Sequence, residues 1–527
     1  MEDSQSKRLV KGALMLTVAG FISKLLSAGY RIPLQNMTGD LGFYIYQQIY
    51  PFLGIVLVLS LYGFPSAISK VVVDLRTANK GLSFTSFYVP IFIILCIING
   101  AITLFLFLKS GEIAQWMGNA RLETGLKLSA FAFLLIPFTA LFRGVFQGNF
   151  QMKPTAVSQV GEQFMRVFII ILAAAFIAIR KDNIYHIGPA AAIASIAGGM
   201  VALMLLIGSL RRQKPIGNST FAVPWSYYLK TMLLFGVFAS LNHMVLLFIQ
   251  FADAFTLVPG LVTYGLTQLD AMELKGVFDR GQPLIQLGTV IGSSFALALI
   301  PSISRQRLQA DPEQFYFYVR TAMKCSIYLA VGATIGLVMV FPEANMLLFQ
   351  DFQGTGSLRI LVIAILLCSV AITAASILQG LGYIKRTALY ITVALVIKWM
   401  ANLLLVPSWE ITGSALATVI SLSVLCGFVL VELKRKLPGL LLGKGLNYQA
   451  LCTSGLGMVI YLLIAKYIIT RLGLHSRIGL LIYVMVIALT GAIVYLTLLI
   501  KRKAFTKEEL RLLPFSSLFI RILPRKD

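Results

Sequence analysis

Long apolar runs follow one another along almost the whole chain, and each is long enough to cross a membrane. A spanning helix needs about 20 apolar residues, and we count fourteen such runs. They are expected at residues 12–36, 43–72, 84–108, 122–147, 155–179, 184–209, 226–252, 271–302, 315–341, 357–380, 386–406, 411–432, 448–470 and 477–500. Backbone in lipid must satisfy its hydrogen bonds internally. The sequence therefore predicts an all-α polytopic membrane protein with 14 transmembrane helices.

The charge of the chain fits this class. Only 13% of the residues are charged and 58% are hydrophobic, whereas a soluble protein carries about 25% charged residues. The net charge of +24 does not indicate a nucleic-acid partner, because Lys and Arg gather in alternate short connections and at the C-terminus. Such connections face the cytoplasm. We therefore expect a multi-pass protein with cytoplasmic N- and C-termini.

Residue types that carry enzyme chemistry are sparse. The five cysteines stand singly in apolar runs, without a CxxC pair, and the three histidines are scattered. The chain has no GxxxxGK[ST] phosphate-binding loop and no Ser/His/Asp set. We expect no metal, no cofactor and no enzymatic activity.

The chain also repeats itself. FQGNFQMKPTA (Phe146–Ala156) matches LQGLGYIKRTA (Leu378–Ala388), and PSAIS at Pro65–Ser69 matches PSIS at Pro301–Ser304. An even number of spans separates the copies, so both halves have the same orientation in the membrane, as in transporters that bind between two repeats. The predicted parts are an N-lobe at 1–217, a C-lobe at 218–437, two further spans at 438–500 and a basic amphipathic tail at 501–527. The tail either lies on the anionic inner leaflet or is solvated.

Charged residues at membrane depth mark the candidate sites. In the first span, Lys24 lies too deep to reach the surface easily and indicates a water-filled cavity, whereas Arg31, near the outer end, either faces that cavity or snorkels. Arg143 suits helix-end packing or gating. Glu162 and Arg166, four residues apart, form either an intrahelical salt bridge or part of a substrate site.

The eighth span opens with Glu273, Lys275, Asp279 and Arg280. Lys275 and Asp279 are spaced for an intrahelical pair, and Arg280 has no obvious local partner beyond Asp279. The cluster is either a charged helix end among the lipid headgroups or a site inside the protein.

Further along, Asp253 ends the seventh span, and Lys398 and Asn402 lie four apart in the eleventh. A lysine in the membrane core is neutral, has a carboxylate partner or contacts an anion, and Asp253 is a candidate partner. The first half and the eighth span thus hold more cations than acids. Such a cavity suits an anion, and guanidinium suits phosphate because it binds two oxygens at once.

Four motifs resemble a known family. They are RIPLQNMTGDLGFYIYQQIYP, YGFPSAISK, LFRGVFQGNFQMKPTAVSQVGEQ and FDRGQPLIQLG. Together they are similar to the polysaccharide-flippase branch of the MATE-like (MOP) superfamily, in the Firmicute group of MurJ and stage V sporulation protein B. The resemblance covers essentially the whole chain. It implies two six-helix lobes in a V, a lipid-tail groove formed by the last two spans, and alternating access for a lipid-pyrophosphate-linked sugar.

The resemblance also implies site residues. MurJ proteins hold the pyrophosphate with arginines in the first, second and eighth spans. Lys24 falls on the first of these, Arg31 lies one position past the second, and Arg280 is near the eighth-span arginine, whereas the second span has no arginine before Gly63.

Some relatives bind sodium through an acid in the seventh span, two polar residues in the eleventh and a threonine in the twelfth, which Asp253, Asn402 and Thr418 match approximately. Because Lys398 stands at one ligand position, we expect an Asp253–Lys398 pair and no sodium.

These observations predict a flippase for lipid II or a related cell-wall or surface-polysaccharide precursor, in the bacterial plasma membrane. The substrate-binding residues are expected to be Lys24, Arg31, Arg280 and Arg166, with membrane lipids and cell-wall synthesis proteins as partners. Two alternatives stay open. A cation-coupled MATE-type drug exporter would have acids in its cavity and usually twelve spans, and a non-transporting scaffold for wall synthesis would leave the buried cations without a purpose.

Overall fold

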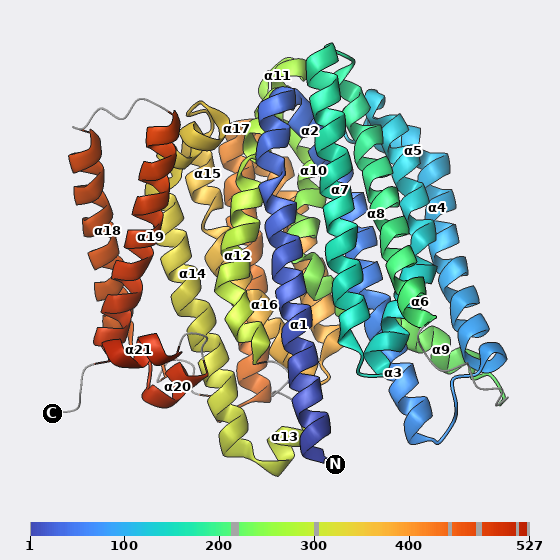
Figure 1. Cartoon of the computed structure of the whole chain (residues 1–527). Coiled ribbons are helices and arrows are strands. Elements are labelled where there is room, and N and C mark those ends of the chain that lie inside the picture. Colours follow the sequence, from blue (N-terminus) through green and yellow to red (C-terminus); the bar gives the residue numbers. More distant parts are fainter. Residues whose placement is uncertain are drawn as a thin grey trace. The chain divides into compact units, whose positions relative to one another are not determined.

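The computed structural model describes residues 2–211, 221–299, 305–440, 445–470, 477–512 and 516–523, and their regular elements are helices (Figure 1). The α-helices are α1 (Glu2–Gly29), α2 (Arg31–Val58), α3 (Phe64–Thr77), α4 (Val89–Trp116), α5 (Glu123–Ala132), α6 (Ile136–Gly148), α7 (Met152–Arg180), α8 (Ile187–Leu210), α9 (Trp225–Thr231), α10 (Val245–Tyr264), α11 (Gln268–Asp279), α12 (Gly281–Ala298), α13 (Arg305–Ala310), α14 (Pro312–Phe349), α15 (Thr355–Leu361), α16 (Ala364–Gly380), α17 (Ile384–Lys436), α18 (Tyr448–Thr470), α19 (Arg477–Lys501), α20 (Lys507–Arg511) and α21 (Ser516–Ile522).

Short 3₁₀ or π segments interrupt several of these helices. They are η1 (Leu59–Gly63), η2 (Phe84–Tyr88), η3 (Ala120–Leu122), η4 (Phe133–Leu135), η5 (Ile184–His186), η6 (Met232–Phe238) and η7 (Ala239–Met244). The π segments η1, η2 and η6 are of a rare kind that is frequent at functional sites, whereas 3₁₀ turns are common at helix ends. The apolar runs thus fold as helices, and the all-α fold class is confirmed.

Eleven helical segments in the described residues are long and apolar enough to cross a membrane. Two of them exceed one crossing, because Met15–Thr77 has 63 residues and Ile384–Lys436 has 53, against about 20 for a single span. The first is broken at Gly39, which has a φ of +69°, and the second at Trp409 and Glu410, where Glu410 has a φ of +51°. The eighth predicted span is divided between α11 and α12. The described helices are therefore compatible with fourteen crossings.

The chain forms two compact units. Unit 1 comprises Met1–Pro283 and Ile384–Ser414, and unit 2 comprises Leu284–Tyr383 and Ala415–Asp527. Lys24, Arg31, Arg280, Asp253 and the other candidate site residues all belong to unit 1, whereas Thr418 belongs to unit 2. The predicted lobes at 1–217 and 218–437 follow a sequence repeat rather than packing, and that division stays a prediction.

Glycines allow the closest helix contacts of unit 1. A Cβ atom on Gly276 in α11 would lie 2.2 Å from the backbone oxygen of Asp40 in α2, and one on Gly63 in η1 would lie 2.4 Å from the backbone oxygen of Gly236 in η6. No side chain fits at either distance. Gly276 lies one helical turn before Arg280. The close approach at Gly276 therefore places α2 beside the part of the candidate site that contains Arg280.

In unit 2, the start of the predicted tail packs on the core. Leu510 is completely buried, and Glu509 accepts two hydrogen bonds of 2.9 Å from Lys324 in α14. Thr506 caps α20 in a reciprocal capping box with Glu509. Glu509 and Leu510 therefore pack on the core of unit 2, whereas Lys501, Lys503 and Lys507 are exposed. Whether the tail is lipid-bound or solvated stays a prediction.

Candidate functional site

A buried network of charges joins α6 and α7 inside unit 1. Glu162 lies between two arginines, 2.8 Å from Nη2 of Arg143 and 3.1 Å from Nη2 of Arg166. Arg143 also donates to Ser158 and to the backbone oxygen of Ser60. The predicted intrahelical pair of Glu162 and Arg166 is therefore present. Arg143 is completely buried, and its contacts are those of a residue that holds α6 against α7.

Arg31, the first residue of α2, has a different environment. Its side chain is completely buried, and its guanidinium carbon lies 4.0 Å from the centre of the Tyr50 ring. Its three guanidinium nitrogens have no hydrogen-bond partner in the described part of the chain. The snorkelling alternative is wrong, since a completely buried side chain does not reach the membrane surface.

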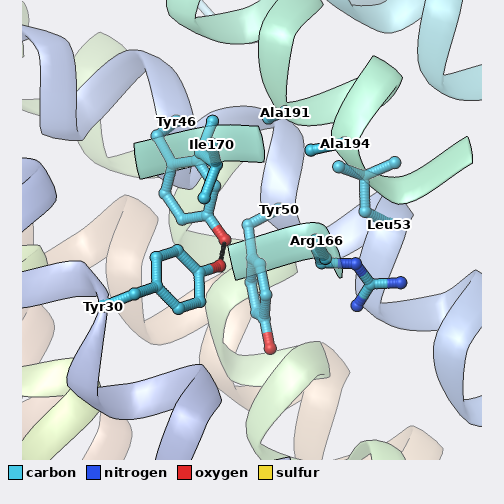
Figure 2. A pocket seen from close by; sticks show the side chains of 8 residues that line it. All are labelled: Tyr30, Tyr46, Tyr50, Leu53, Arg166, Ile170, Ala191 and Ala194. Carbon is cyan, nitrogen blue, oxygen red and sulfur yellow. Dashed lines mark hydrogen bonds between the residues drawn. The ribbon is translucent and has the colours of Figure 1, made fainter. Parts of the chain in front are cut away.

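A small cavity lies beside this arginine's stacking partner (Figure 2). Three tyrosines line it, together with Arg166 and apolar residues from α2, α7 and α8: Tyr30, Tyr46, Tyr50, Leu53, Arg166, Ile170, Ala191 and Ala194. The hydroxyls of Tyr30 and Tyr46 hydrogen-bond to each other. The sequence did not predict that these tyrosines line a cavity, although the i,i+4 spacing of Tyr46 and Tyr50 places them on one helix face.

Two ion pairs lie at the junction of α11 and α12. Lys275 contacts Asp279 at 2.6 Å, as the four-residue spacing predicts. Arg280 pairs with Asp40 of α2. Its Nε lies 2.8 Å from Oδ1 of Asp40, and its Nη2 lies 2.5 Å from Oδ2. The Oδ1 atom also accepts a hydrogen bond from Gln35.

The alternative of a charged helix end among the headgroups is wrong for three members of this cluster. Lys275, Asp279 and Arg280 are each 2% exposed or less. Glu273, by contrast, is exposed and is not part of the site. The sequence held one signal for the Arg280–Asp40 pair. Asp40 is an acidic residue shortly after the first predicted span, so it could pair with a cation.

A third group joins α10 and the first part of α17. Nζ of Lys398 lies 2.7 Å from Oδ1 of Asp253, so the predicted ion pair is confirmed. The same oxygen accepts hydrogen bonds of 2.8 Å from Asn402 and from Ser414. Lys398 also donates to Asn402 and to the backbone oxygen of Ser414. The ammonium occupies the centre of this polar group. In the described residues, no three His, Cys, Asp or Glu side chains form a metal-binding group.

Lys24 lies in α1, where its side chain is partly exposed. One turn earlier, the Cα of Gly20 faces the hydroxyl of Tyr62 and the amide of Gln159. The Tyr62 ring stacks on His243, with ring centres 4.4 Å apart. Lys24 is thus beside a polar and aromatic wall, and its access to a water-filled cavity stays a prediction.

The charge balance differs between the two regions of unit 1. Around α10, α11 and α17, Lys275, Arg280 and Lys398 each have a carboxylate partner, namely Asp279, Asp40 and Asp253. Around α2, α6 and α7, the buried charged side chains of the described residues are those of Arg31, Arg143 and Arg166 and one carboxylate, Glu162, which binds Arg143 and Arg166. Three cations against one anion leave an excess of two positive charges. This region is therefore the electropositive part of the site.

Solved structures of membrane transporters share this fold. The structure of "Lipid II flippase MurJ, inward closed conformation" matches with a TM-score of 0.66 at 13% identity, over 92% of this chain and 98% of that one. The inward-facing structure of a multidrug resistance MATE family transporter of the MOP superfamily matches with a TM-score of 0.62 at 16% identity, over 81% and 95%. The protein is thus a multi-pass membrane protein with the fold of this transporter superfamily.

The chain belongs to the polysaccharide biosynthesis protein family, whose model matches residues 9–307. The uncharacterized membrane protein YabM of Bacillus subtilis (strain 168) is 35% identical over 98% of this chain and 97% of its own length. The lipid II flippase MurJ of the same organism is 26% identical over 81% of this chain and 83% of its own. The predicted membership in the flippase branch of the MOP superfamily is confirmed.

Proposed function

We propose that this protein moves a lipid-linked oligosaccharide that carries an anionic pyrophosphate, such as lipid II or a related wall or surface-polysaccharide precursor, across the bacterial plasma membrane. The observation that carries the proposal is the excess of buried arginines over carboxylates among the described residues around α2, α6 and α7. A lipid-exposed protein gains nothing from unpaired cations at membrane depth, and such groups mark ligand pathways by default. The family and the MurJ relative support an oligosaccharide as the cargo.

The proposed head-group contacts are Lys24, Arg31, Arg280 and Arg166. Arg280 already binds a carboxylate through two nitrogens, and this two-point geometry is the one that guanidinium presents to phosphate. A phosphate would therefore compete with Asp40 for the same face of Arg280. In the proposed cycle, α2 separates from α11, Asp40 releases Arg280, and the pyrophosphate takes its place.

The other charged residues have supporting parts in this proposal. Arg143 and Glu162 hold α6 against α7, and Lys275–Asp279 and Asp253–Lys398–Asn402 stiffen the opposite helices. Because these groups are paired within the protein, they keep their charges without the substrate. The proposed movement makes and breaks no covalent bond, so no enzymatic step is required.

A membrane potential that is positive outside favours the outward movement of an anionic head group, by about 2.3 kcal/mol per elementary charge per 100 mV. A cationic site that moved outward with the pyrophosphate would reduce the net charge that moves, and with it this gain. With both termini in the cytoplasm, as the distribution of Lys and Arg predicts, the head group is collected at the inner leaflet.

The test is complementation in bacterial cells depleted of MurJ. The parent chain is compared with Lys24→Ala, Arg280→Ala and a control, Lys127→Ala, whose exposed partner is Glu123. We expect the parent and the control to restore growth and the two site variants to fail while still reaching the membrane. Rescue by both site variants would contradict the site. Failure of the parent, when it is present in the membrane, would contradict lipid II as the cargo and favour another wall-polymer precursor, a drug or a scaffolding role.

A further inference from the structure

A stack of two aromatic rings joins two spanning segments of unit 1. The ring of Tyr62 in η1 lies against the imidazole of His243 in η7, with ring centres 4.4 Å apart and an angle of 17° between the planes. Both residues stand where the spans depart from a regular α-helix, since η1 is a π segment and η7 is a 3₁₀ segment. A departure of this kind inside a helix often marks a functional place. Neither ring belongs to the proposed head-group contacts or to the ion pairs that support them.

Polar groups from two further helices meet this stack. Gln159 in α7 donates a hydrogen bond from Nε2 to the Tyr62 hydroxyl, at 3.3 Å. In α1, a Cβ atom on Gly20 would lie 3.5 Å from the same hydroxyl, so α1 passes directly beside it. Lys24, one turn further along α1, acts electrostatically on the His243 ring. Four elements, α1, η1, α7 and η7, therefore bring rings and polar groups to one place.

The stacked rings can be reached from a space inside the protein. His243 is exposed, and Tyr62 and Lys24 are partly exposed. His243 also lies near the middle of the spanning segment Trp225–Tyr264, and the protein that surrounds it desolvates its ring. An ionisable side chain at membrane depth faces a protein-lined cavity rather than lipid. The exposed surface of the stack is therefore one that a ligand inside the protein can contact.

The groups around the stack suit a neutral ligand that is rich in hydroxyls. The Tyr62 hydroxyl accepts its hydrogen bond from Gln159, so its own O–H can still donate. A neutral imidazole supplies one donor and one acceptor, and ring surfaces are apolar. Lys24, Tyr62, Gln159 and His243 include no carboxylate, so a cationic drug would meet an ammonium without a counter-charge. A sugar fits better, because its C–H groups pack on an aromatic ring while its hydroxyls exchange hydrogen bonds with the polar groups.

The position of Lys24 indicates which sugar would lie there. Lys24 is one of the proposed contacts of the pyrophosphate, and it lies close enough to His243 to act on it electrostatically. In a lipid-linked oligosaccharide, one sugar is bonded directly to the pyrophosphate through a single oxygen. A phosphate held at Lys24 therefore brings this first sugar next to the stacked rings.

From these observations we propose that Tyr62, Gln159 and His243 form a carbohydrate subsite, which holds the pyrophosphate-linked sugar and selects the cargo by that sugar. Tyr62 orients the imidazole by stacking, Gln159 orients the Tyr62 hydroxyl, and the exposed rings receive the sugar. The inference rests on the proposed function and adds a contact that cations do not provide. Guanidinium and ammonium groups bind the pyrophosphate that different wall precursors share, whereas rings and hydroxyls contact the part in which those precursors differ.

The experiment compares the binding of two lipids to the purified chain. One is bare polyprenyl pyrophosphate, and the other is the same lipid with one N-acetylated sugar attached. We expect the parent to bind the sugar-bearing lipid about tenfold more tightly, which is the gain that one ring contact and one hydrogen bond supply. Equal affinities for the two lipids would overturn the subsite and leave the proposed function in place, whereas binding of neither lipid would contradict both.

Variants separate a sugar contact from helix packing. His243→Ala should lower the affinity for the sugar-bearing lipid to that of the bare lipid, and Tyr62→Phe, which keeps the ring and removes the hydroxyl, should lose part of the difference. Phe107→Ala breaks another ring contact of unit 1, between Phe107 and Phe131, and should keep the preference for the sugar. If His243→Ala weakens the binding of both lipids equally, the ring only packs the helices and the subsite is overturned. If His243→Ala does not fold, the parent and Tyr62→Phe still decide.

Discussion

Arg280 and Asp40, which lie 240 positions apart in the sequence, form a two-point ion pair between the end of α11 and α2. The arginine is 1% exposed, whereas the carboxylate is 20% exposed. Arg280 thus lies in the protein interior, whereas the carboxylate of Asp40 lies partly at the protein surface. This asymmetry makes Asp40 the more replaceable member of the pair.

We expect Asp40→Asn to destabilise the folded protein by about 2 kcal/mol, because it removes the carboxylate charge that the buried Arg280 binds through two nitrogens. The reversed pair, Asp40→Arg with Arg280→Asp, should recover part of the loss. Unfolding in detergent, analysed as a double-mutant cycle, measures the coupling. The exposed pair Lys127–Glu123 is the control, with an expected coupling of about 0.3–0.5 kcal/mol. A coupling no larger than that of the control would argue against an interior pair.

The contact between α11 and α2 should not tolerate a side chain at Gly276. A Cβ there would meet the backbone oxygen of Asp40 at 2.2 Å, so Gly276→Ala must push the helices apart and lower the unfolding temperature. Gly100 in α4 is the matched control, since nothing lies within 4 Å of a Cβ at that position. Gly100→Ala should be neutral or stabilise by up to about 1 kcal/mol. Equal effects of the two substitutions would contradict the close approach.

The pair of Lys398 and Asp253 predicts a specific pattern of stabilities. Lys398→Met leaves a buried carboxylate with neutral donors only, at a cost of about 3–5 kcal/mol. Lys398→Met combined with Asp253→Asn removes both charges and should restore most of that stability. If the double variant unfolds as easily as the single one, charge compensation is not what Lys398 provides.

Sodium should not stabilise this protein specifically. Lys398 already places an ammonium 2.7 Å from Oδ1 of Asp253, and a cation cannot share that position with it. Thermal unfolding in sodium chloride and in potassium chloride at equal concentrations should therefore give the same midpoint. A rise confined to sodium would show that an ion enters the Asp253 group in spite of the lysine.

The segment after α19 should behave as part of the folded core. Glu509 is buried against Lys324, so Glu509→Ala should release α20 and expose the bonds after Lys507 and Arg511 to trypsin. We expect cleavage at least several times faster than in the parent, measured by mass spectrometry of the fragments. Glu508→Ala, at the exposed neighbouring position, should leave the rate unchanged. Rapid cleavage of the parent itself would argue against the packed arrangement.

Local regularities in the sequence were sufficient for part of this structure. Hydropathy predicts the helices because membrane backbone has few other choices. The pairs Lys275–Asp279 and Glu162–Arg166 follow from the geometry of a single helix turn. Asp253 and Lys398 could be matched across the chain because each was a rare charge in an apolar run.

Other contacts could not be predicted, since they depend on which helices approach each other. The partner of Arg280 is such a case, because the approach of α2 to α11 depends on the glycine at position 276. The burial of Glu509 on α14 is another, since a short charged helix after the last span has the same composition whether it is packed or solvated. The surroundings of Arg31 also required the structure, because no pattern in a sequence shows that its guanidinium stacks on Tyr50 and finds no hydrogen-bond acceptor among the described residues.

Lys398 has a consequence for how this protein can be powered. An ion bound from solution leaves when its concentration falls, so its occupancy reports the gradient across the membrane. An ammonium on a side chain cannot dissociate into either aqueous phase, and its local concentration beside Asp253 is set by covalent geometry. Occupancy of this position is therefore indifferent to the sodium or potassium outside the cell, and a gradient of either metal ion can do work on the protein only at some other place.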